Sequence, residues 1–382
     1  MKNLKNLAAS MLALGFLSCN AQPTDHPIGV NPSPTKIQVL ICLDVSGSMT
    51  GLIDQAKDQL WNMVSVMGRA KNQDIAPQIE IALYEYGRPS NGVNNGYIKR
   101  INGFTSDLDQ VSKNLFGLTI DGGDEYCGHV IYTALNDLNW DTSTQNYKVV
   151  FIAGNEDFYQ GGTSYTKACA LARKKGVIVN TIYCGDKNEG IREHWNLAGE
   201  CGNGSFTNIN QNVTVADIAT PYDSSLFDLN TKLNGTYITY GNMGAANWQK
   251  QSEVDQLNYS KNKSSALKRV SVKGSKEIYK NSTWDLVDAS TEDKDVVTKI
   301  DKKTLPESMK NKSEAEIKAI VTLKKEERTS IQNNIADITK KRQDFIVAEK
   351  LKTTQGTAQA TLESEIEKII KKQAIKFNLV IK

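Results

Sequence analysis

Residues 37–48 read IQVLICLDVSGS, an apolar run that ends in Asp44, Ser46 and Ser48. The run before Asp44 is almost entirely aliphatic, which is typical of a central parallel strand buried on both faces. The D-x-S-x-S pattern therefore follows the carboxyl end of a strand, where open α/β sheets bind their ligands. One carboxylate and two hydroxyls in a tight turn at Gly47 are suitable ligands for a hard divalent cation, foremost Mg²⁺, with Ca²⁺ or Mn²⁺ as alternatives.

From Lys36 to about Asp217 the sequence alternates strand and helix patterns. Strands are expected at residues 78–86, 97–104, 147–152 and 177–183. Helices are expected at residues 52–69, 107–116, 126–138, 164–175 and 191–199. Strands that alternate with helices predict an α/β fold with a doubly wound, mostly parallel sheet and helices on both faces.

At this point residues 36–218 resemble the von Willebrand factor type A (vWA) domain, whose metal-ion-dependent adhesion site opens with D-x-S-x-S after the first strand. The resemblance implies a vWA or Rossmann-like sheet and a cation held by Asp44, Ser46 and Ser48. The alternative is a solvated loop in which Asp44 caps the helix that begins near Leu52.

The resembled family adds a threonine from a second loop and an aspartate from a third. Here the second loop reads TIDGGDE at 119–125, and Asp124 stands at the threonine position. The third reads AGNED at 153–157, where Gly154 stands at the aspartate position and Asn155 or Glu156 substitutes by a shift of one or two residues. The alternative is that Asp124 caps the helix starting at Tyr126 and that Asn155 and Glu156 shape a turn.

The charge at position 124 changes what the resembled site implies. Neutral hydroxyls leave the cation under-compensated, so that an acidic residue of a partner protein completes its coordination. Asp124 would supply that negative charge internally and weaken the attraction for a partner carboxylate. A structural ion, or Ca²⁺ with its larger number of oxygen ligands, is then expected.

The first 19 residues have the pattern of a targeting segment. Lys2 and Lys5 precede an apolar stretch, and the sequence FLSC at 16–19 resembles a bacterial lipobox, although Phe16 departs from its usual aliphatic residue. The resemblance implies that Cys19 is acylated and that the proline-containing residues 20–35 form a tether. An ordinary secretory signal cleaved nearby is the alternative.

Length and composition limit the remaining classes. The 382 residues allow more than one domain at a usual ~100 to 200 residues each. A net charge of only +3 predicts no nucleic-acid partner. After Cys19 five cysteines remain, with no C-x-x-C spacing that would indicate a zinc site.

Residues 219–382 are predicted to form a mainly helical C-terminal region. Ser313 and Glu316 make a capping box at the start of a long helical pattern. Gly356 interrupts this pattern, which restarts at Leu362. Two long amphipathic helices with a short connection predict an antiparallel hairpin over about 313–376.

These observations predict a lipid-anchored protein of the bacterial cell envelope, on its periplasmic or surface face. We expect it to act as a binding or assembly module for an unknown protein partner, rather than as an enzyme. One alternative is a metal-dependent hydrolase, for which Glu125, Glu156 and His129 are the candidate bases. Another alternative is a metal-free structural scaffold of the envelope.

Overall fold

The computed structural model describes residues 34–49, 52–209, 218–353 and 362–381. Residues 34–382 form one compact unit. The predicted signal segment, Cys19 and most of the tether lie outside the described residues. In the described ranges, no helix has the length and apolar content that a membrane span requires.

A six-stranded sheet is at the centre of the N-terminal half, in the order β4-β3-β1-β5-β6-β7. All neighbours are parallel except β3 and β4, which are antiparallel. The strands are β1 Lys36–Asp44, β3 Gln78–Tyr86, β4 Lys99–Thr105, β5 Tyr147–Gly154, β6 Ile178–Cys184 and β7 Asn203–Ile209. The chain passes from β1 to β3 on one side and later to β5 on the other, so that β1 lies where the strand order reverses.

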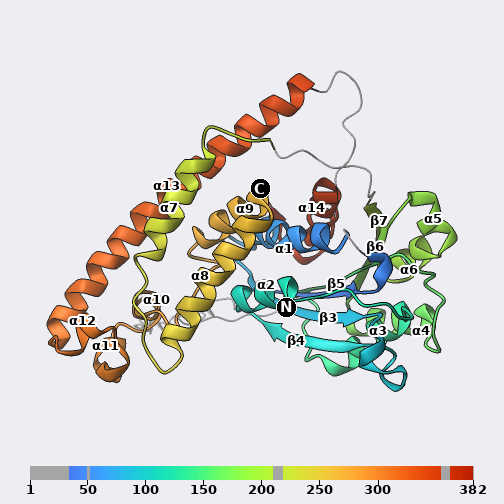
Figure 1. Cartoon of the computed structure of the whole chain (residues 1–382), viewed down its shortest axis with the longest axis horizontal. Helices are drawn as coiled ribbons and strands as arrows, with labels where there is room; N and C mark the ends of the chain where they lie inside the picture. The colour runs from blue at the N-terminus through green and yellow to red at the C-terminus, as the bar shows by residue number, and fades with distance from the viewer. Residues whose placement is uncertain (1–33, 50–51, 210–217, 354–361, 382) are drawn as a thin grey trace, which may run out of the picture. The chain divides into compact units, whose positions relative to one another are not determined.

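Helices cover both faces of this sheet, as Figure 1 shows. The alternation of side chains along β1 explains the two layers: Val39 and Ile41 face one apolar core, and Leu40 and Cys42 face the other. The first core includes residues of α1 Leu52–Gly68, α2 Leu108–Phe116 and α14 Leu362–Ala374. The second includes residues of α3 Cys127–Asp137, α4 Tyr165–Lys175 and α6 Trp195–Cys201. The predicted doubly wound α/β fold is therefore confirmed.

Two details of this part differ from the sequence prediction. The helix expected at 191–199 is divided into α5 Lys187–Arg192 and α6, because His194 between them has a left-handed backbone with φ 65°. Strand β7 was not predicted, since its sequence NGSFTNI is largely polar and only half-buried along most of its length. The five cysteines that the structure describes are free thiols.

The C-terminal region is mainly helical, as predicted. It contains α7 Asp223–Asn234, α8 Gly244–Lys261, α9 Lys263–Lys273, α10 Leu286–Glu292, α11 Val296–Lys299, α12 Glu307–Lys310 and α13 Glu314–Thr353. The capping box at the start of α13 is present, because the Ser313 amide donates to Glu316 Oε2 at 2.8 Å and the Glu316 amide to Ser313 Oγ at 3.3 Å.

Helices α13 and α14 pack on different partners in the described residues, and not on each other as a hairpin. Helix α13 lies along α7 and also contacts α9 and α10, whereas α14 packs on α1 and β7. The apolar face of α14, with Ile366 and Ile370, belongs to the core under the sheet. The sequence pattern specified that face correctly, but a periodic pattern does not identify the surface that covers it.

Residue Gln373 fixes α14 to the sheet through buried hydrogen bonds. Its Oε1 accepts from Tyr147 Oη at 2.7 Å, and its Nε2 donates to Asn180 Oδ1 at 2.7 Å. Shortly after α14 along the chain, strand β8 Val380–Ile381 pairs antiparallel with the short strand β2 Ala70–Lys71. The α/β layer is thus completed by residues near position 380.

Candidate metal site

The predicted first loop lies at the carboxyl end of β1, where the strand order reverses. Asp44 is the last residue of β1 and is fully buried. Its neighbour Ser46 is also buried, whereas Ser48 is exposed. The three side chains thus run from the core to the surface. They lie at the sheet edge where α/β folds bind ligands.

Hydrogen bonds join the first loop to the third. The Ser46 amide donates to Asp44 Oδ1 at 2.7 Å, within the loop itself. The hydroxyls of Ser46 and Ser48 are 2.8 Å apart. Ser48 Oγ then donates to Asn155 Oδ1 at 2.8 Å, across 107 positions of the sequence. The structure therefore brings Asn155 next to the D-x-S-x-S motif, as the predicted one-residue shift requires.

The second carboxylate oxygen of Asp44 is orphaned. Asp44 Oδ2 is buried and has no hydrogen-bond partner among the described residues. Burial raises the pKa of Asp44 to about 6, and the charge of Glu156 adds to this effect, although bonds from Ser46 and Asn155 oppose it. An unpaired buried carboxylate oxygen is costly, and a bound cation is one way to compensate it.

Glu125 is the second buried carboxylate of the site. It is 5% exposed, and burial raises its pKa to about 8, with further contributions from the charges of Asp44 and Glu156. A hydrogen bond with the Ser46 side chain opposes the rise. The sequence predicts Glu125 only as a candidate base, because the threonine position of the resembled family falls on the preceding residue, Asp124.

Asp124, the predicted ligand from the second loop, is exposed, and its side chain forms a hydrogen bond with Tyr97. Together with partial burial, its charge and a hydrogen bond raise the pKa of Tyr97. The alternative that Asp124 caps the following helix is wrong, because Tyr126 is at the N-cap position of α3 and no side-chain cap bond is present there. The geometry therefore favours Glu125 over Asp124 as the neighbour of Asp44.

Glu156 lies at the third loop, half-buried, and acts on both buried carboxylates by its charge. Gln160 Nε2 donates to Glu156 Oε2 at 3.3 Å, and Trp195 Nε1 donates to the Glu156 carbonyl at 2.8 Å. The Gln160 side chain also accepts from the Glu125 amide at 3.3 Å. One glutamine thus links the second and third loops.

Glycines at two positions let the backbone approach these carboxylates closely. At Gly154 a Cβ atom would collide with the Tyr86 hydroxyl and would lie 3.2 Å from Asp44 Cβ. At Gly87, where φ is +85°, a Cβ would lie 2.9 Å from Asp44 Oδ1. The Tyr86 side chain, whose hydroxyl donates to the Ala153 carbonyl at 2.9 Å, therefore excludes an aspartate at position 154.

The donor set suits a hard cation. Asp44, Ser46, Ser48 and Asn155 offer carboxylate, hydroxyl and amide oxygens, the ligands preferred by Mg²⁺, Ca²⁺ and Mn²⁺. Across the part of the chain that the structure describes, no three histidine, cysteine, aspartate or glutamate side chains are placed to share one ion. An ion here would therefore depend on the hydroxyls and the amide as well as on Asp44.

Comparison with solved structures finds partial likenesses. Proximal thread matrix protein 1 from the mussel byssus is 17% identical with a TM-score of 0.34, over 46% of this chain and 42% of its own. An aerotolerance-related membrane protein from Bacteroides fragilis is 15% identical with a TM-score of 0.34, over 46% of this chain and 92% of its own. The SpRpn10 VWA domain is 12% identical with a TM-score of 0.34, over 46% of this chain and 88% of its own.

No family model matches the chain, and no curated protein matches it. The solved structures that resemble the chain include vWA domains, and the likeness covers a little under half of its length. At these scores the assignment to the doubly wound α/β class rests on the observed strand order and on the helices on both faces.

Proposed function

We propose that this protein is a cell-envelope lipoprotein that acts as a protein-binding or assembly module through a cation held at the end of β1. The observation that supports the proposal most strongly is the buried, unpartnered Oδ2 of Asp44 beside Ser46. Asp44, Ser46, Ser48 and Asn155 would hold the ion, and bound Mg²⁺ would supply a fixed positive charge that orients the three loops.

The charge balance distinguishes this site from one that attracts acidic partners. Asp44 is buried, and the charge of Glu156 helps to raise its pKa. The charges of Asp44 and Glu156 in turn help to raise the pKa of Glu125. With Asp44 as a ligand and the charges of Glu125 and Glu156 close by, little of the positive charge of a divalent ion is left to attract an aspartate of a partner. We therefore propose that the ion orders the binding surface and that the partner recognises the ordered loops.

Titration with Mg²⁺ and Ca²⁺ tests the metal. We expect both ions to raise the melting temperature of the parent protein and to have no effect on Asp44→Ala. Ser46→Ala and Ser48→Ala should weaken the response. The control is Asp121→Ala, which removes an exposed carboxylate from the second loop. A parent protein that gives neither a thermal shift nor heat in calorimetry would instead support the metal-free scaffold.

Membrane attachment is tested at Cys19. If Cys19 is acylated, Cys19→Ala releases the protein from the membrane fraction, because the lipid on Cys19 is the proposed apolar anchor. Ser18→Ala changes a neighbouring residue while keeping the cysteine, and serves as the control. A Cys19→Ala protein that stays with the membrane would contradict the lipoprotein assignment.

The partner is sought by affinity capture from solubilised membranes. Capture with the parent protein in Mg²⁺ should retain a partner that is lost with a chelator and with Asp44→Ala. If the retained proteins do not depend on the metal, the cation has no part in recognition.

A hydrolase is a second candidate because burial raises the pKa of Glu125 to about 8, and a raised pKa is typical of a group tuned for acid or base chemistry. Assays with phosphate and peptide esters in Mg²⁺ test this alternative. Activity that disappears in Glu125→Gln but not in Asp121→Ala would support it.

A further inference from the structure

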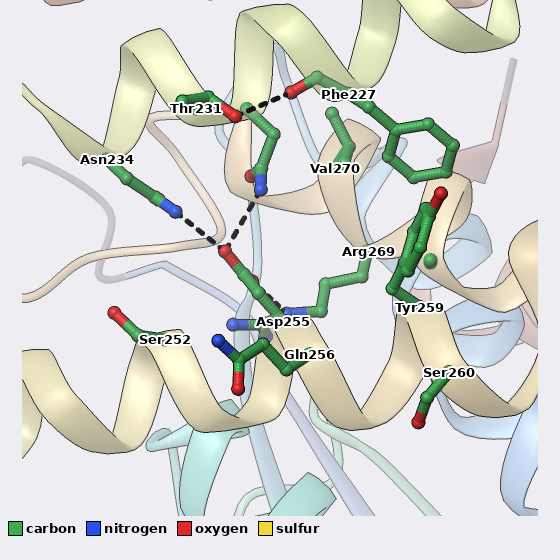
Figure 2. Close-up of a pocket in the computed structure, with 12 residues that line it drawn as sticks. Phe227, Thr231, Asn234, Ser252, Asp255, Gln256, Tyr259, Ser260, Arg269 and Val270 are labelled. Carbon is green, nitrogen blue, oxygen red and sulfur yellow. Dashed lines mark hydrogen bonds and ion pairs between the residues drawn. The ribbon is translucent and has the colours of Figure 1, made fainter.

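A cavity of about 570 Å³ lies between α7, α8 and α9, far along the sequence from the loops of the candidate metal site. Figure 2 shows that side chains from the three helices converge on it. A second cavity of about 350 Å³ shares Asn234 and follows the same helix α8 back to Ala245. Residues of α8 from Ala245 to Ser260, over ~22 Å of helix, line the two cavities, and together these cavities are named the groove.

The base of the groove carries compensated charges. Arg269 Nε donates to Asp255 Oδ1 at 2.7 Å, and Lys273 Nζ donates to Asp255 Oδ2 at 2.7 Å. Arg269 also bonds Asp109 at 2.6 Å. Two basic and two acidic groups balance here, so that the groove has no net charge from this network with which to hold an ion.

The hydroxyls that line the larger cavity have donated their hydrogens to their own helices. Thr231 Oγ1 donates to the Phe227 carbonyl at 3.1 Å, and Ser252 Oγ to the Trp248 carbonyl at 3.1 Å. Ser260 Oγ donates to the Leu257 carbonyl at 3.0 Å. Each hydroxyl has one hydrogen, so the lone pairs that remain accept hydrogen bonds. This wall therefore suits a ligand with several hydrogen-bond donors.

Aromatic rings lie at both ends of the groove. Phe227 and Tyr259 pack edge to face with ring centroids 4.9 Å apart, and Figure 2 shows them together at one end of the cavity. Tyr259 is 52% exposed, and Trp248 in the second cavity is 42% exposed. Exposed rings of this kind offer flat apolar surfaces next to polar groups.

We propose that the groove between α7 and α8 binds a neutral saccharide chain. Sugar rings combine an apolar face, which packs on Tyr259 and Trp248, with hydroxyls that donate to Thr231, Ser252 and the exposed amide of Gln256. An organic cation fits less well, because Arg269 and Lys273 lie in and beneath the base of the groove. The length of the groove fits several linked sugars better than one.

The test is calorimetric titration of the intact protein with four neutral tetrasaccharides (chitotetraose, cellotetraose, maltotetraose and mannotetraose) and with their single sugars. We expect at least one tetrasaccharide to bind, at least about tenfold more tightly than its single sugar. Tyr259→Ala and Trp248→Ala should each weaken binding about tenfold or more. Tyr159→Ala, which removes an equally exposed ring elsewhere, should leave it unchanged.

Two further measurements keep the proposal falsifiable. Gln256→Ala alters an exposed side chain, and circular dichroism checks that the variant is folded, so that a weaker affinity reports the lost contact. A chelator should have no effect, because the groove is independent of the proposed cation. Absence of binding by all four tetrasaccharides, or binding of an uncharged Gly-Ser-Asn peptide in their place, would overturn the proposal.

Discussion

Asp44 is fully buried and Asp255 is largely shielded from solvent, yet their surroundings shift their pKa values in opposite directions. Burial raises the pKa of Asp44 to about 6, and no basic side chain is among the causes acting on it. Burial alone would also raise the pKa of Asp255, but the charges of Lys273 and Arg269 hold it well below its ordinary value. The protein supplies basic partners to the carboxylate of Asp255, but none to the carboxylate of Asp44.

The difference separates a structural charge network from a site that is suited to a ligand. The Arg269 network contains its own counter-ions, and so does Arg328, which bonds Asp285 and Asp288 at 2.6 Å each. These groups join helices α8, α9, α10 and α13 to their neighbours. The Asp44 cluster contains carboxylates that repel one another, which fits a group whose compensation comes from outside the chain.

The largest expected effect on the free energy of unfolding is in the Arg269 network, whose charges are paired within the protein. Arg269→Met leaves the buried charge of Asp109 without its basic partner and Asp255 with Lys273 alone, and we expect a loss on the order of 3–5 kcal/mol in the free energy of unfolding. Urea unfolding measures this loss. Lys113→Met is the control, because its 2.7 Å pair with Glu253 is exposed and should contribute less than about 1 kcal/mol. Equal losses in the two variants would contradict the distinction.

A smaller effect is expected on the uncompensated side, and it depends on pH. The folded-state pKa of Glu125 lies at about 8, above its ordinary 4.5, so the folded protein binds more protons between these values. Without metal, the free energy of unfolding should therefore fall as the pH rises from 4.5 to 8. Glu125→Gln should remove part of this fall, on the order of 1–3 kcal/mol, in urea unfolding across that range. A parallel pH profile in Glu125→Gln would count against the coupled cluster.

Added metal should reverse that trend. A cation binds deprotonated carboxylates, so the rise in melting temperature on adding Mg²⁺ or Ca²⁺ should be small at pH 5 and larger at pH 8. Thermal unfolding with and without ion at both pH values measures the difference. A shift that is equal at pH 5 and pH 8 would show that Asp44 and Glu125 take no part in binding.

The smallest effect is expected at Asp124, which is exposed and faces Tyr97. Asp124→Thr should change the free energy of unfolding by less than about 0.5 kcal/mol. Its effect on metal affinity, measured by calorimetry, should be smaller than that of Glu125→Gln. A larger loss of affinity in Asp124→Thr would restore Asp124 as the ligand from the second loop.

Much of the α/β layer was predictable because its signals are local. The aliphatic run before Asp44 indicated a central strand, and β1 lies between β3 and β5. The D-x-S-x-S motif placed Ser46 and Ser48 correctly at the end of that strand. The third loop was also accessible, since Asn155 required only a shift of one position.

The rest depends on contacts between distant residues, which one sequence does not reveal. Position 154 has no room for the expected aspartate because the Tyr86 hydroxyl occupies the space beside it, and Tyr86 comes from β3, which β1 separates from β5. The orientation that buries Glu125 and exposes Asp124 is decided by packing, since both residues are acidic and adjacent. In the same way, the periodicity of α14 predicted an apolar face but not its position on α1.

The attachment of α14 to the sheet has a consequence for how the chain folds. Gln373 meets Tyr147 across 226 positions of the sequence and Asn180 across 193. Closing such long loops costs entropy before the contacts are made, and a high contact order slows folding. During synthesis, the apolar surface under the sheet is fully covered only after residues 362–381 have been made. We therefore expect nascent chains to expose the part of this core that α14 covers until late in elongation, and to rely on chaperones during that interval.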